Sequence, residues 1–491
     1  MTLDHDLQSI QSAREIIRNA RAAADALAEF SQAQLDTICA EIAKDGEAHA
    51  RPLAELAVEE TGFGRAEDKI LKNLLGSKLT WEAWKGVPAV GVLTEDKHAG
   101  LMEVGVPVGV VAALIPSTNP TSTTLYKAII SLKAGNAVVF SPHPGAKRCI
   151  LETVQLIQNA AKRADAPEHA VQSLELLTMQ ATETLMRHHD VGVILATGGA
   201  AMVRAAYSSG NPAIGVGPGN GPAFIERSAD IPRAVRHIVE SKTFDNGVIC
   251  ASEQSIVTES CIAQKVEEEL KRQECYFLTE GESASLAKLL LRANGTMNPK
   301  IVGKTALEIA GMAGISVPQS TRVLLSRQES VSPQIAYCHE KLCPVLAYYV
   351  EPGWEAACLR CLALLGVEGA GHTMAIHSQD EGVIRAFAMK KPVSRLLVNT
   401  PAALGGVGAT TGLSPALTLG CGSVGGSATS DNVGPLHLRD IRRVAWGVEE
   451  LGALRAIRGQ ESGDAKHAPT EIVTPEDIAA ITRKVMERLK L

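Results

Sequence analysis

Residues 109–141 read GVVAALIPSTNPTSTTLYKAIISLKAGNAVVFS, and this stretch decides the fold. An apolar strand over 109–115 stops at two prolines, an apolar helix follows over 122–132, and a Gly-Asn turn leads into a second strand over 137–141. Apolar strands joined by helices are typical of a parallel sheet that is covered on both faces. The stretch therefore predicts the opening strand–helix–strand unit of an α/β fold.

The same alternation continues along the chain. We expect strands over 191–196, 255–258 and 345–350 and helices over 146–164, 200–207 and 262–272. Residues 1–70 read as helices, because apolar residues recur there at steps of three and four. A chain of 491 residues is too long for one core. The pattern therefore indicates a doubly wound parallel sheet and at least one further domain.

Composition narrows the class of protein. A net charge of −6 gives no basic face for a nucleic acid, and no apolar run is long enough to cross a bilayer. The first residues lack a signal peptide, which favours the cytoplasm, where thiols stay reduced. Cys358 and Cys361 form an isolated CxxC, and His372 and His377 lack a zinc-binding spacing, so we expect no metal site.

Residues 243–254 read TFDNGVICASEQ and single out Cys250. A Gly/Asn-containing turn before the cysteine and small residues after it suit an accessible, nucleophilic thiol. Most cysteines are instead small buried packing residues, and no histidine adjoins Cys250 in the sequence. The residues alone leave both interpretations open.

A family resemblance favours the nucleophile. The pattern Phe-Asp-Asn-Gly-x-Ile-Cys-Ala-Ser-Glu-Gln resembles the nucleophile motif of CoA-acylating aldehyde dehydrogenases of the acetaldehyde and propionaldehyde type. Further similar segments occur in the expected order at 115–123, 141–144, 215–220, 369–373 and 405–426. The resemblance implies an aldehyde-dehydrogenase-like α/β fold. It also implies an enzyme that oxidises a short-chain aldehyde with CoA as co-substrate and NAD as cofactor, NADP being the alternative.

The resemblance also implies a route. The Cys250 thiolate attacks the aldehyde, hydride passes to the nicotinamide, and CoA takes the acyl group from the thioester left on Cys250. The tetrahedral oxyanion needs preorganised donors, for which the amide of Asn119 and the backbone N–H of Cys250 are the candidates. Matching the neighbouring prolines to the wider superfamily puts Thr118 at this position instead, and a turn-capping role is a further interpretation of Asn119.

The expected acyl acceptor depends on Val216. Hydrolytic members of the superfamily carry a glutamate in a Glu-Leu-Gly-Gly-Lys type segment, and the matching run here is VGPGN over 216–220. Loss of a general base removes roughly 10²–10⁴-fold from attack by water. The resemblance therefore implies transfer to CoA. Hydrolysis to the free acid is the enzymatic alternative, and a catalytically idle scaffold is the alternative from another class.

Cofactor-binding residues follow from the same likeness. The implied set is Ser141 and His143 at the adenosine end, Thr197, Gly198 and Gly199 in the pyrophosphate turn, Gly217, and Glu340 on the nicotinamide ribose. Hydrolytic relatives carry a lysine near the position of Ser141, and its absence leaves NAD versus NADP open. CoA also carries adenosine phosphates and is expected to reuse this pocket. His372 is a further catalytic candidate, with a hydrogen-bonded structural histidine as the equal alternative.

The resemblance divides the chain into four parts. They are a nucleotide-binding domain over 1–218, a catalytic domain over 219–424 that carries Cys250, a return to the nucleotide-binding or oligomerisation region over 425–458, and a linker with a tail helix over 459–491. A hairpin over 90–106 and a strand near 436–446 are expected to bridge subunits of a homodimer or a dimer of dimers.

The tail combines a linker-like segment with an amphipathic helix, whose apolar stripe includes Ile478, Ile481, Val485 and Leu489. It resembles the encapsulation peptides of bacterial microcompartments. This implies shell or cargo proteins as partners of 471–491 and a cytoplasmic enzyme inside such a compartment. A helix that packs on its own or a neighbouring subunit is the alternative. The sequence leaves the aldehyde open: acetaldehyde and propionaldehyde suit small surroundings, and sulfoacetaldehyde or another substituted aldehyde is the alternative.

Overall fold

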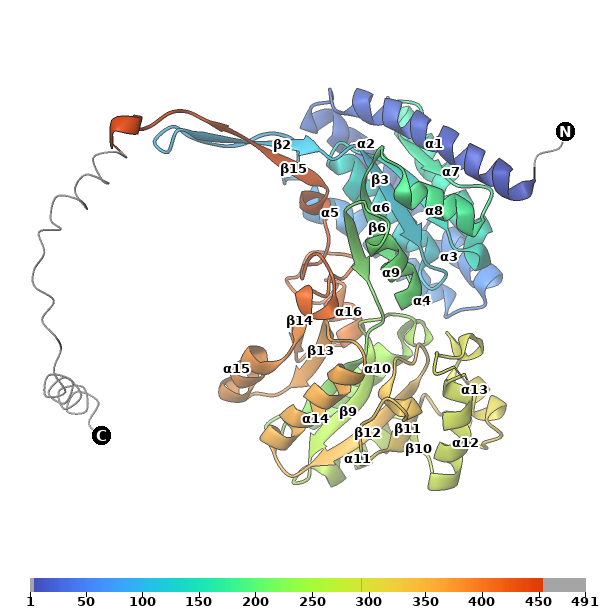
Figure 1. Cartoon of the computed structure of the whole chain (residues 1–491). Coiled ribbons are helices and arrows are strands. Elements are labelled where there is room, and N and C mark those ends of the chain that lie inside the picture. Colours follow the sequence, from blue (N-terminus) through green and yellow to red (C-terminus); the bar gives the residue numbers. More distant parts are fainter. Residues whose placement is uncertain (1–3, 293, 454–491) are drawn as a thin grey trace, which may run out of the picture. The chain divides into compact units, whose positions relative to one another are not determined.

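The computed structural model describes residues 4–292 and 294–453. The predicted linker and tail helix over 459–491 lie outside the described residues. Parallel sheets with helices along them dominate the described part (Figure 1), which confirms the predicted α/β class. Within these residues, no helix combines the length and the apolar character that a membrane span requires.

The N-terminal region is helical, as the apolar spacing predicts. Its helices are α1 (His5–Leu27), α2 (Gln32–Ala48), α3 (Ala50–Thr61), α4 (Ala66–Leu74) and α5 (Thr80–Trp84), with a π-helical turn, η1 (Leu75–Leu79), before α5. Ser31 starts α2 through a capping box with Gln34. α3 ends at Gly62, whose left-handed φ of 67° a glycine adopts without steric cost. The chain then turns directly into α4, which reaches the candidate site.

The first parallel sheet has the strand order β5-β4-β3-β6-β7. Its elements are β3 (Val110–Ile115), α6 (Pro120–Lys133), β4 (Ala137–Pro142), α7 (Lys147–Arg163), β5 (Val171–Ser173), α8 (Met179–Arg187), β6 (Val191–Thr197), α9 (Ala200–Tyr207) and β7 (Ala213–Val216). The strand order reverses between β3 and β6, which confirms the predicted doubly wound topology. Ligands of such sheets bind beyond the carboxyl ends of the strands at this switch point.

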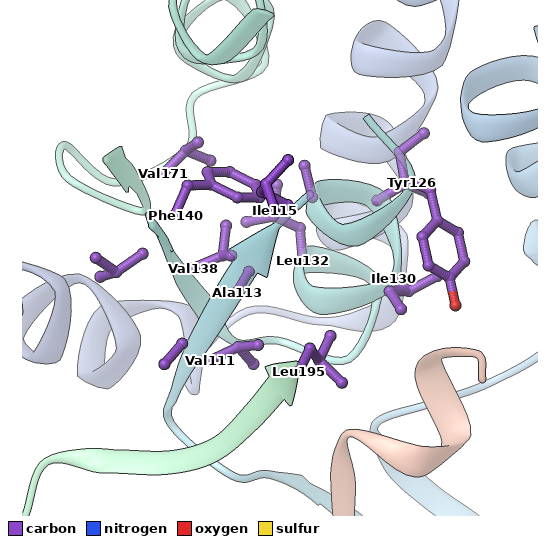
Figure 2. Close-up of a cluster of buried hydrophobic side chains, with 14 of the residues drawn as sticks. Val111, Ala113, Ile115, Tyr126, Ile130, Leu132, Val138, Phe140, Val171 and Leu195 are labelled. Carbon is purple, nitrogen blue, oxygen red and sulfur yellow. The ribbon is translucent and has the colours of Figure 1, made fainter. Parts of the chain in front are cut away.

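The core of this region surrounds β3. Every residue of β3 and of α6 is buried, as expected for a sheet that is covered on both faces. Figure 2 shows Val111, Ala113 and Ile115 of β3 in one apolar cluster with Phe140 of β4 and Ile130 of α6. Burial of one large apolar side chain stabilises the fold by roughly 1.5–3 kcal/mol. The cluster therefore fixes the strand ends at which several site residues lie.

The second parallel sheet has the order β10-β11-β12-β9-β8-β13-β14. Its strands are β8 (Gly221–Ile225), β9 (Glu253–Glu259), β10 (Cys275–Phe277), β11 (Val323–Arg327), β12 (Val345–Glu351), β13 (Gly371–His377) and β14 (Val393–Val398). Its helices are α10 (Ile231–Thr243), α11 (Ala263–Arg272), α12 (Glu280–Leu290), α13 (Ala306–Met312), α14 (Trp354–Val367), α15 (Glu381–Lys390) and α16 (Ala402–Gly406). The strands and the helix predicted after Cys250 are confirmed, with small shifts at their ends.

The predicted hairpin and the predicted late strand form a third sheet. Its order is β1-β2-β15, with β1 (Gly91–Asp96), β2 (Leu101–Pro107) and β15 (Arg439–Ala445). A 3₁₀ turn, η7 (Pro435–His437), takes the residues at which the late strand was expected to begin. Among the described residues, Thr94–Glu103 and the stretch 443–453 belong to a compact unit of their own. A single chain does not test the expected role of this sheet in subunit contact, which stays a prediction.

Candidate active site

Cys250 follows a strained turn between α10 and β9. The turn is a 3₁₀ segment, η3 (Phe244–Gly247), in which Asp245 and Asn246 have φ values of 48° and 51°. A left-handed backbone costs a residue of this kind roughly 1–3 kcal/mol and persists only where surrounding contacts enforce it. Cys250 is partly exposed, as predicted, whereas residues 245–249 just before it are buried.

Buried cations from α4 hold this turn. The Asp245 carboxylate accepts hydrogen bonds from the backbone N–H of Arg65 at 2.7 Å, from Lys69 Nζ at 2.9 Å and from Lys72 Nζ in a shorter contact. Only a glycine fits at Gly64, because a Cβ there would lie 1.9 Å from Asp245 Oδ1. Sequence analysis missed this cluster. The sequence shows only a pair of lysines three residues apart on one helix, and such a pair usually faces solvent, so it did not mark a buried cluster.

Lys72 joins the Cys250 turn to Asn119. Its Nζ donates to Asn119 Oδ1 at 2.6 Å and to the Val248 carbonyl at 2.8 Å. Asn119 is the N-cap residue of α6, yet its side chain makes no capping hydrogen bond. The turn-capping interpretation of Asn119 is therefore wrong. Asn119 Nδ2 makes a long contact of 3.5 Å with the Thr118 hydroxyl, so its donors are left for a stronger acceptor.

The Cys250 thiol is held in its protonated form. Although part of the residue is exposed, burial around the sulfur raises its pKa to about 12, and the negative charge of Glu340 acts in the same direction. The Arg395 guanidinium opposes the shift. Arg395 is itself buried and donates to the carbonyl oxygens of His372 at 3.1 Å and Gly420 at 2.6 Å. At pH 7 the thiol is neutral, so its attack on a substrate has to be accompanied by loss of its proton.

The segment VGPGN over 216–220 packs against Cys250. A Cβ on Gly219 would lie 1.9 Å from the Cys250 carbonyl oxygen, so a larger residue does not fit there. The Gly219 N–H donates to Glu340 Oε1 at 2.9 Å. Val216 ends β7 and is buried. The structure thus brings Cys250, Gly219 and Glu340 together. Val216, at the position that is predicted to determine the acyl acceptor, is apolar.

Glu340 is a carboxyl group with an unusual charge state. Burial raises its pKa to about 8, and the hydrogen bond from Gly219 opposes this shift. The negative charge of Glu368, which accepts the Glu340 backbone N–H at 2.8 Å, raises the pKa further. At pH 7 the Glu340 carboxyl is therefore mostly protonated.

The predicted nucleotide residues, apart from Glu340, lie at or after the ends of neighbouring strands of the first sheet. β3 pairs in parallel with both β4 and β6, so the residues at and after the strand ends, such as Ser141 and Thr197, lie at one carboxyl edge. Gly199 is the N-cap of α9 and has no capping side chain, so the first N–H groups of the helix can face a phosphate. Lys127 of α6 lies beneath this edge and donates to the carbonyls of Leu114 and Leu195, both at 2.8 Å.

Ser141 and His143 differ in their surroundings. Ser141 ends up buried, with its hydroxyl 3.0 Å from that of Thr182. His143 is exposed, and its Nδ1 accepts the Gly145 N–H at 3.0 Å. The neutral imidazole therefore carries its proton on Nε2. His143 can offer that donor to a ligand, whereas Ser141 would have to exchange the partner it has.

His372 lies in β13 and is buried. Its Nδ1 contacts the Thr373 hydroxyl at 2.9 Å, and among the described residues its Nε2 has no hydrogen-bond partner. Burial and the positive charge of Arg395 lower the pKa of His372 to about 3, so the ring is neutral at pH 7. A buried polar atom without a partner is costly. Nε2 is thus a buried polar atom that lacks a hydrogen-bond partner among the described residues.

A cavity of about 710 Å³ lies beside β13 and β14. Its lining includes Gly371, Lys391, residues 392–394, residues 421–424 and residues 427–430. Cys421 lines this cavity and also raises the pKa of Cys250, so the cavity comes near the thiol. Its volume lies within the usual range of small-molecule sites.

Other groups with metal-binding potential lie apart from these contacts. Cys358 and Cys361 are buried free thiols on α14. In the part of the chain that the structure describes, His188, His189 and Asp190 place their ligand atoms within 4.8 Å of one another. Only His189 of this cluster is exposed, and no site residue named above belongs to the cluster.

Comparison with known proteins identifies the family. The sequence profile described as the aldehyde dehydrogenase family matches residues 6–276. Together with the fold and the surroundings of Cys250, this match shows that the chain belongs to the aldehyde dehydrogenase family.

Its relatives place it close to members that are named for acyl transfer. A solved structure of a probable aldehyde dehydrogenase from Listeria monocytogenes is 56% identical, with a TM-score of 0.91, over 92% of this chain and 100% of that chain. The succinate-semialdehyde dehydrogenase (acetylating) of Clostridium kluyveri is 37% identical over 89% of this chain and 96% of its own length. The bifunctional aldehyde-alcohol dehydrogenase of Escherichia coli (strain K12) is 42% identical over 86% of this chain. The chain spans about half of that bifunctional protein, 48% of its length.

Proposed function

We propose that the protein is a CoA-acylating aldehyde dehydrogenase, which oxidises an aldehyde with a nicotinamide dinucleotide and passes the acyl group from Cys250 to CoA. The observation that carries the proposal is the segment 216–220, because it packs on Cys250 and begins with a buried valine. That segment offers no carboxylate to activate water. The thioester would then last until a thiol arrives.

Solved relatives support this assignment. An acetylating aldehyde dehydrogenase from Geobacillus thermoglucosidasius is 47% identical, with a TM-score of 0.90, over 91% of this chain. A propionaldehyde dehydrogenase from Rhodopseudomonas palustris, 27% identical over 88% of this chain, is described with bound CoA and an acylated cysteine. Cys250 is the residue of this chain that its motif and its exposure recommend for that role.

In the first half-reaction, the Cys250 thiol would lose its proton to water, and its sulfur would bond to the aldehyde carbon. The carbonyl oxygen then becomes an oxyanion, and the Asn119 amide and the Cys250 backbone N–H are the proposed donors. One such donor typically contributes about 10²–10³-fold in rate. A nicotinamide bound at this site would supply the hydride acceptor, and loss of the hydride would leave the thioester on Cys250.

In the second half-reaction, Glu340, the carboxyl group near Cys250, is poorly suited to activate water. Glu340 is the carboxylate whose charge acts on Cys250. Its pKa of about 8 leaves it mostly protonated at pH 7, and its Oε1 already accepts the Gly219 N–H. At this pKa only about one-tenth of the Glu340 carboxyl is ionised at pH 7, and one of its oxygens is already engaged by Gly219. This supports thiolysis by CoA over hydrolysis.

For the dinucleotide, we propose Ser141 and His143 at the adenosine end, residues 197–199 and Gly217 around the phosphates, and Glu340 at the nicotinamide ribose. NAD is the first candidate, and NADP is the alternative. An engineered glycolyl-CoA reductase that is 27% identical is described with bound NADP+. CoA is proposed to enter the same pocket after the dinucleotide leaves.

We propose that His372 Nε2 contacts the bound substrate or CoA. Support comes from its buried, unpartnered state among the described residues. A propionaldehyde dehydrogenase from Clostridium phytofermentans, with 29–30% identity, has also been solved as a cysteine-to-alanine and as a histidine-to-alanine variant. A hydrogen bond through a neutral ring suits the lowered pKa of His372.

The test is a panel of aldehydes assayed with NAD or NADP, each with and without CoA. Acetaldehyde and propionaldehyde are compared with succinate semialdehyde and sulfoacetaldehyde, because relatives at 37% and 33% identity carry those two names. The expected result is CoA-dependent turnover that forms acyl-CoA. Turnover that ignores CoA and yields the free acid would mean a hydrolytic enzyme. A Cys250→Ala variant that folds and keeps turning over would exclude the thioester route.

For assembly and location, we propose a homodimer or a dimer of dimers in which residues 90–106 and the strand near 436–446 bridge subunits. We also propose that residues 471–491 bind shell or cargo proteins of a bacterial microcompartment. A relative at 29% identity comes from a microcompartment for fucose utilisation. Deleting residues 470–491 should leave activity in solution intact and abolish co-purification with co-expressed shell proteins. Unchanged co-purification would contradict this role.

A further inference from the structure

Lys72 is a buried cation that the proposed chemistry does not use directly. It lies on α4, far in sequence from Cys250, and its ammonium touches three groups: the Asp245 carboxylate, Asn119 Oδ1 and the Val248 carbonyl. The Lys72 nitrogen thus links Asn119 to the backbone just before Cys250 through two hydrogen bonds. These are the two places from which the oxyanion donors are proposed to come.

We propose that Lys72 is a positioning residue that orients the Asn119 amide, and spaces it from the Cys250 turn, for binding the oxyanion. The role rests on the proposed function. A carboxamide has an acceptor end and a donor end. Because Lys72 holds Oδ1, the Nδ2 donors must point away from Lys72.

The charge on Lys72 adds to this geometric effect. A hydrogen bond from an ammonium to an amide oxygen polarises the amide, which strengthens its N–H groups as donors. Desolvation by burial lowers the pKa of Lys72 to about 8, and the neighbouring Asp245 carboxylate opposes this shift. Lys72 therefore remains mostly charged at pH 7.

Lys69 provides an internal comparison. It lies on the same helix, is equally buried, and donates to the same Asp245 carboxylate at 2.9 Å. Its second contact is the main-chain carbonyl of Thr118 at 3.0 Å, not the Asn119 side chain. A cation that only stabilised the turn would have no need to reach the Asn119 amide. Comparing variants of the two lysines therefore separates the proposed role of Lys72 from stabilisation of the turn.

The experiment compares Lys72→Met with Lys69→Met, Asn119→Ala and the Lys72→Met/Asn119→Ala double variant in the full chain. Acylation is measured as the single-turnover burst of reduced nicotinamide from an aldehyde without CoA. Alkylation of Cys250 by iodoacetamide is measured in parallel, because that reaction needs the thiol and forms no oxyanion. Lys72→Met should slow acylation about 10²-fold, the typical loss for one oxyanion donor, and leave alkylation within about threefold of wild type. Lys69→Met should slow acylation by less than about tenfold.

The double variant decides whether Lys72 acts through Asn119. If it does, the double variant is no slower than Asn119→Ala alone, because effects on one shared interaction do not multiply. Multiplying losses, equal losses in acylation and alkylation, or wild-type acylation by Lys72→Met would each overturn the role. A wild-type chain with no burst from any aldehyde would overturn the proposed function itself, and with it this role.

Two variants that retain the positive charge serve as controls for a failure of the methionine variants to fold. Lys72→Arg and Lys69→Arg retain both cations, but a guanidinium cannot reproduce the contacts of an ammonium. Lys72→Arg should slow acylation by about tenfold or more relative to Lys69→Arg, with alkylation unchanged. Equal acylation rates in the two arginine variants would overturn the proposal.

Discussion

Replacing Val216 by glutamate should turn the enzyme partly into a hydrolase. A well-placed general base speeds attack by water about 10²–10⁴-fold. The new carboxyl would be buried, as Val216 is. Burial raises the pKa of the half-buried Glu340 to about 8 and that of the buried Glu253 to about 7. With a pKa of about 8, roughly one-tenth of the new carboxyl is ionised at pH 7, so the expected gain in thioester hydrolysis is about 10–10³-fold.

The assay isolates the second half-reaction. Cys250 is acylated with aldehyde and dinucleotide in the absence of CoA, excess reagents are removed, and loss of the acyl mass is followed on the intact protein. Val216→Gln is the matched control, because it adds nearly the same volume and polarity without a base. The difference between the hydrolysis rates of the glutamate and glutamine variants should grow from pH 7 to pH 9, since a carboxyl with a raised pKa ionises over that range. A Val216→Glu variant that hydrolyses no faster than Val216→Gln at any of these pH values would refute the argument.

Three further predictions concern charge at the site. Alkylation of Cys250 by iodoacetamide should rise about tenfold per pH unit from pH 7 to pH 9, because its pKa is raised to about 12; a plateau near pH 8 would contradict this. Glu340→Gln should speed alkylation at pH 9 and hardly at pH 7, since Glu340 carries its charge mainly above a pKa of about 8; the ratio of rates at the two pH values checks it. Asp245→Ala leaves the buried Lys69 and Lys72 without their carboxylate and should destabilise the fold by about 3–5 kcal/mol, seen as a lower Tm; an unchanged Tm would disprove it.

The parts of the fold that the sequence predicted are those set by local pattern. The stretch over 109–141 fixes its own strands and helix, because apolar runs and the Gly-Asn turn lie within a few residues of one another. The predicted hairpin over 90–106 and the late strand were found for the same reason. The start of the late strand was misplaced, since Pro435 begins a 3₁₀ turn there.

The candidate site was predicted unevenly for a related reason. Cys250 and Val216 stand in short motifs, so their local surroundings could be inferred from the sequence. The sequence left Asn119 and Thr118 as two choices for the oxyanion donor, because the contact of Asn119 with Lys72 comes from another element. Lys72 lies 47 residues from Asn119 and 173 residues from Asp245. Its helix carries charged residues on several sides, and lysines are rarely buried unless they are paired, so no local pattern distinguishes it.

The two halves of the proposed reaction differ in the same way: one depends on a local motif and the other on contacts between distant segments. The choice of acyl acceptor depends on a missing group at Val216, and an absence can be recognised in a motif without any coordinates. The proposed activation of the aldehyde would depend on contacts that Lys72 makes with two distant segments, and such contacts exist only after α4 has packed on η3 and α6. The proposed choice of acyl acceptor is therefore encoded in a local motif, whereas the proposed oxyanion site forms only in the folded structure. The strained φ values of Asp245 and Asn246 fit this division, because only the folded cluster of cations and carboxylate can hold them.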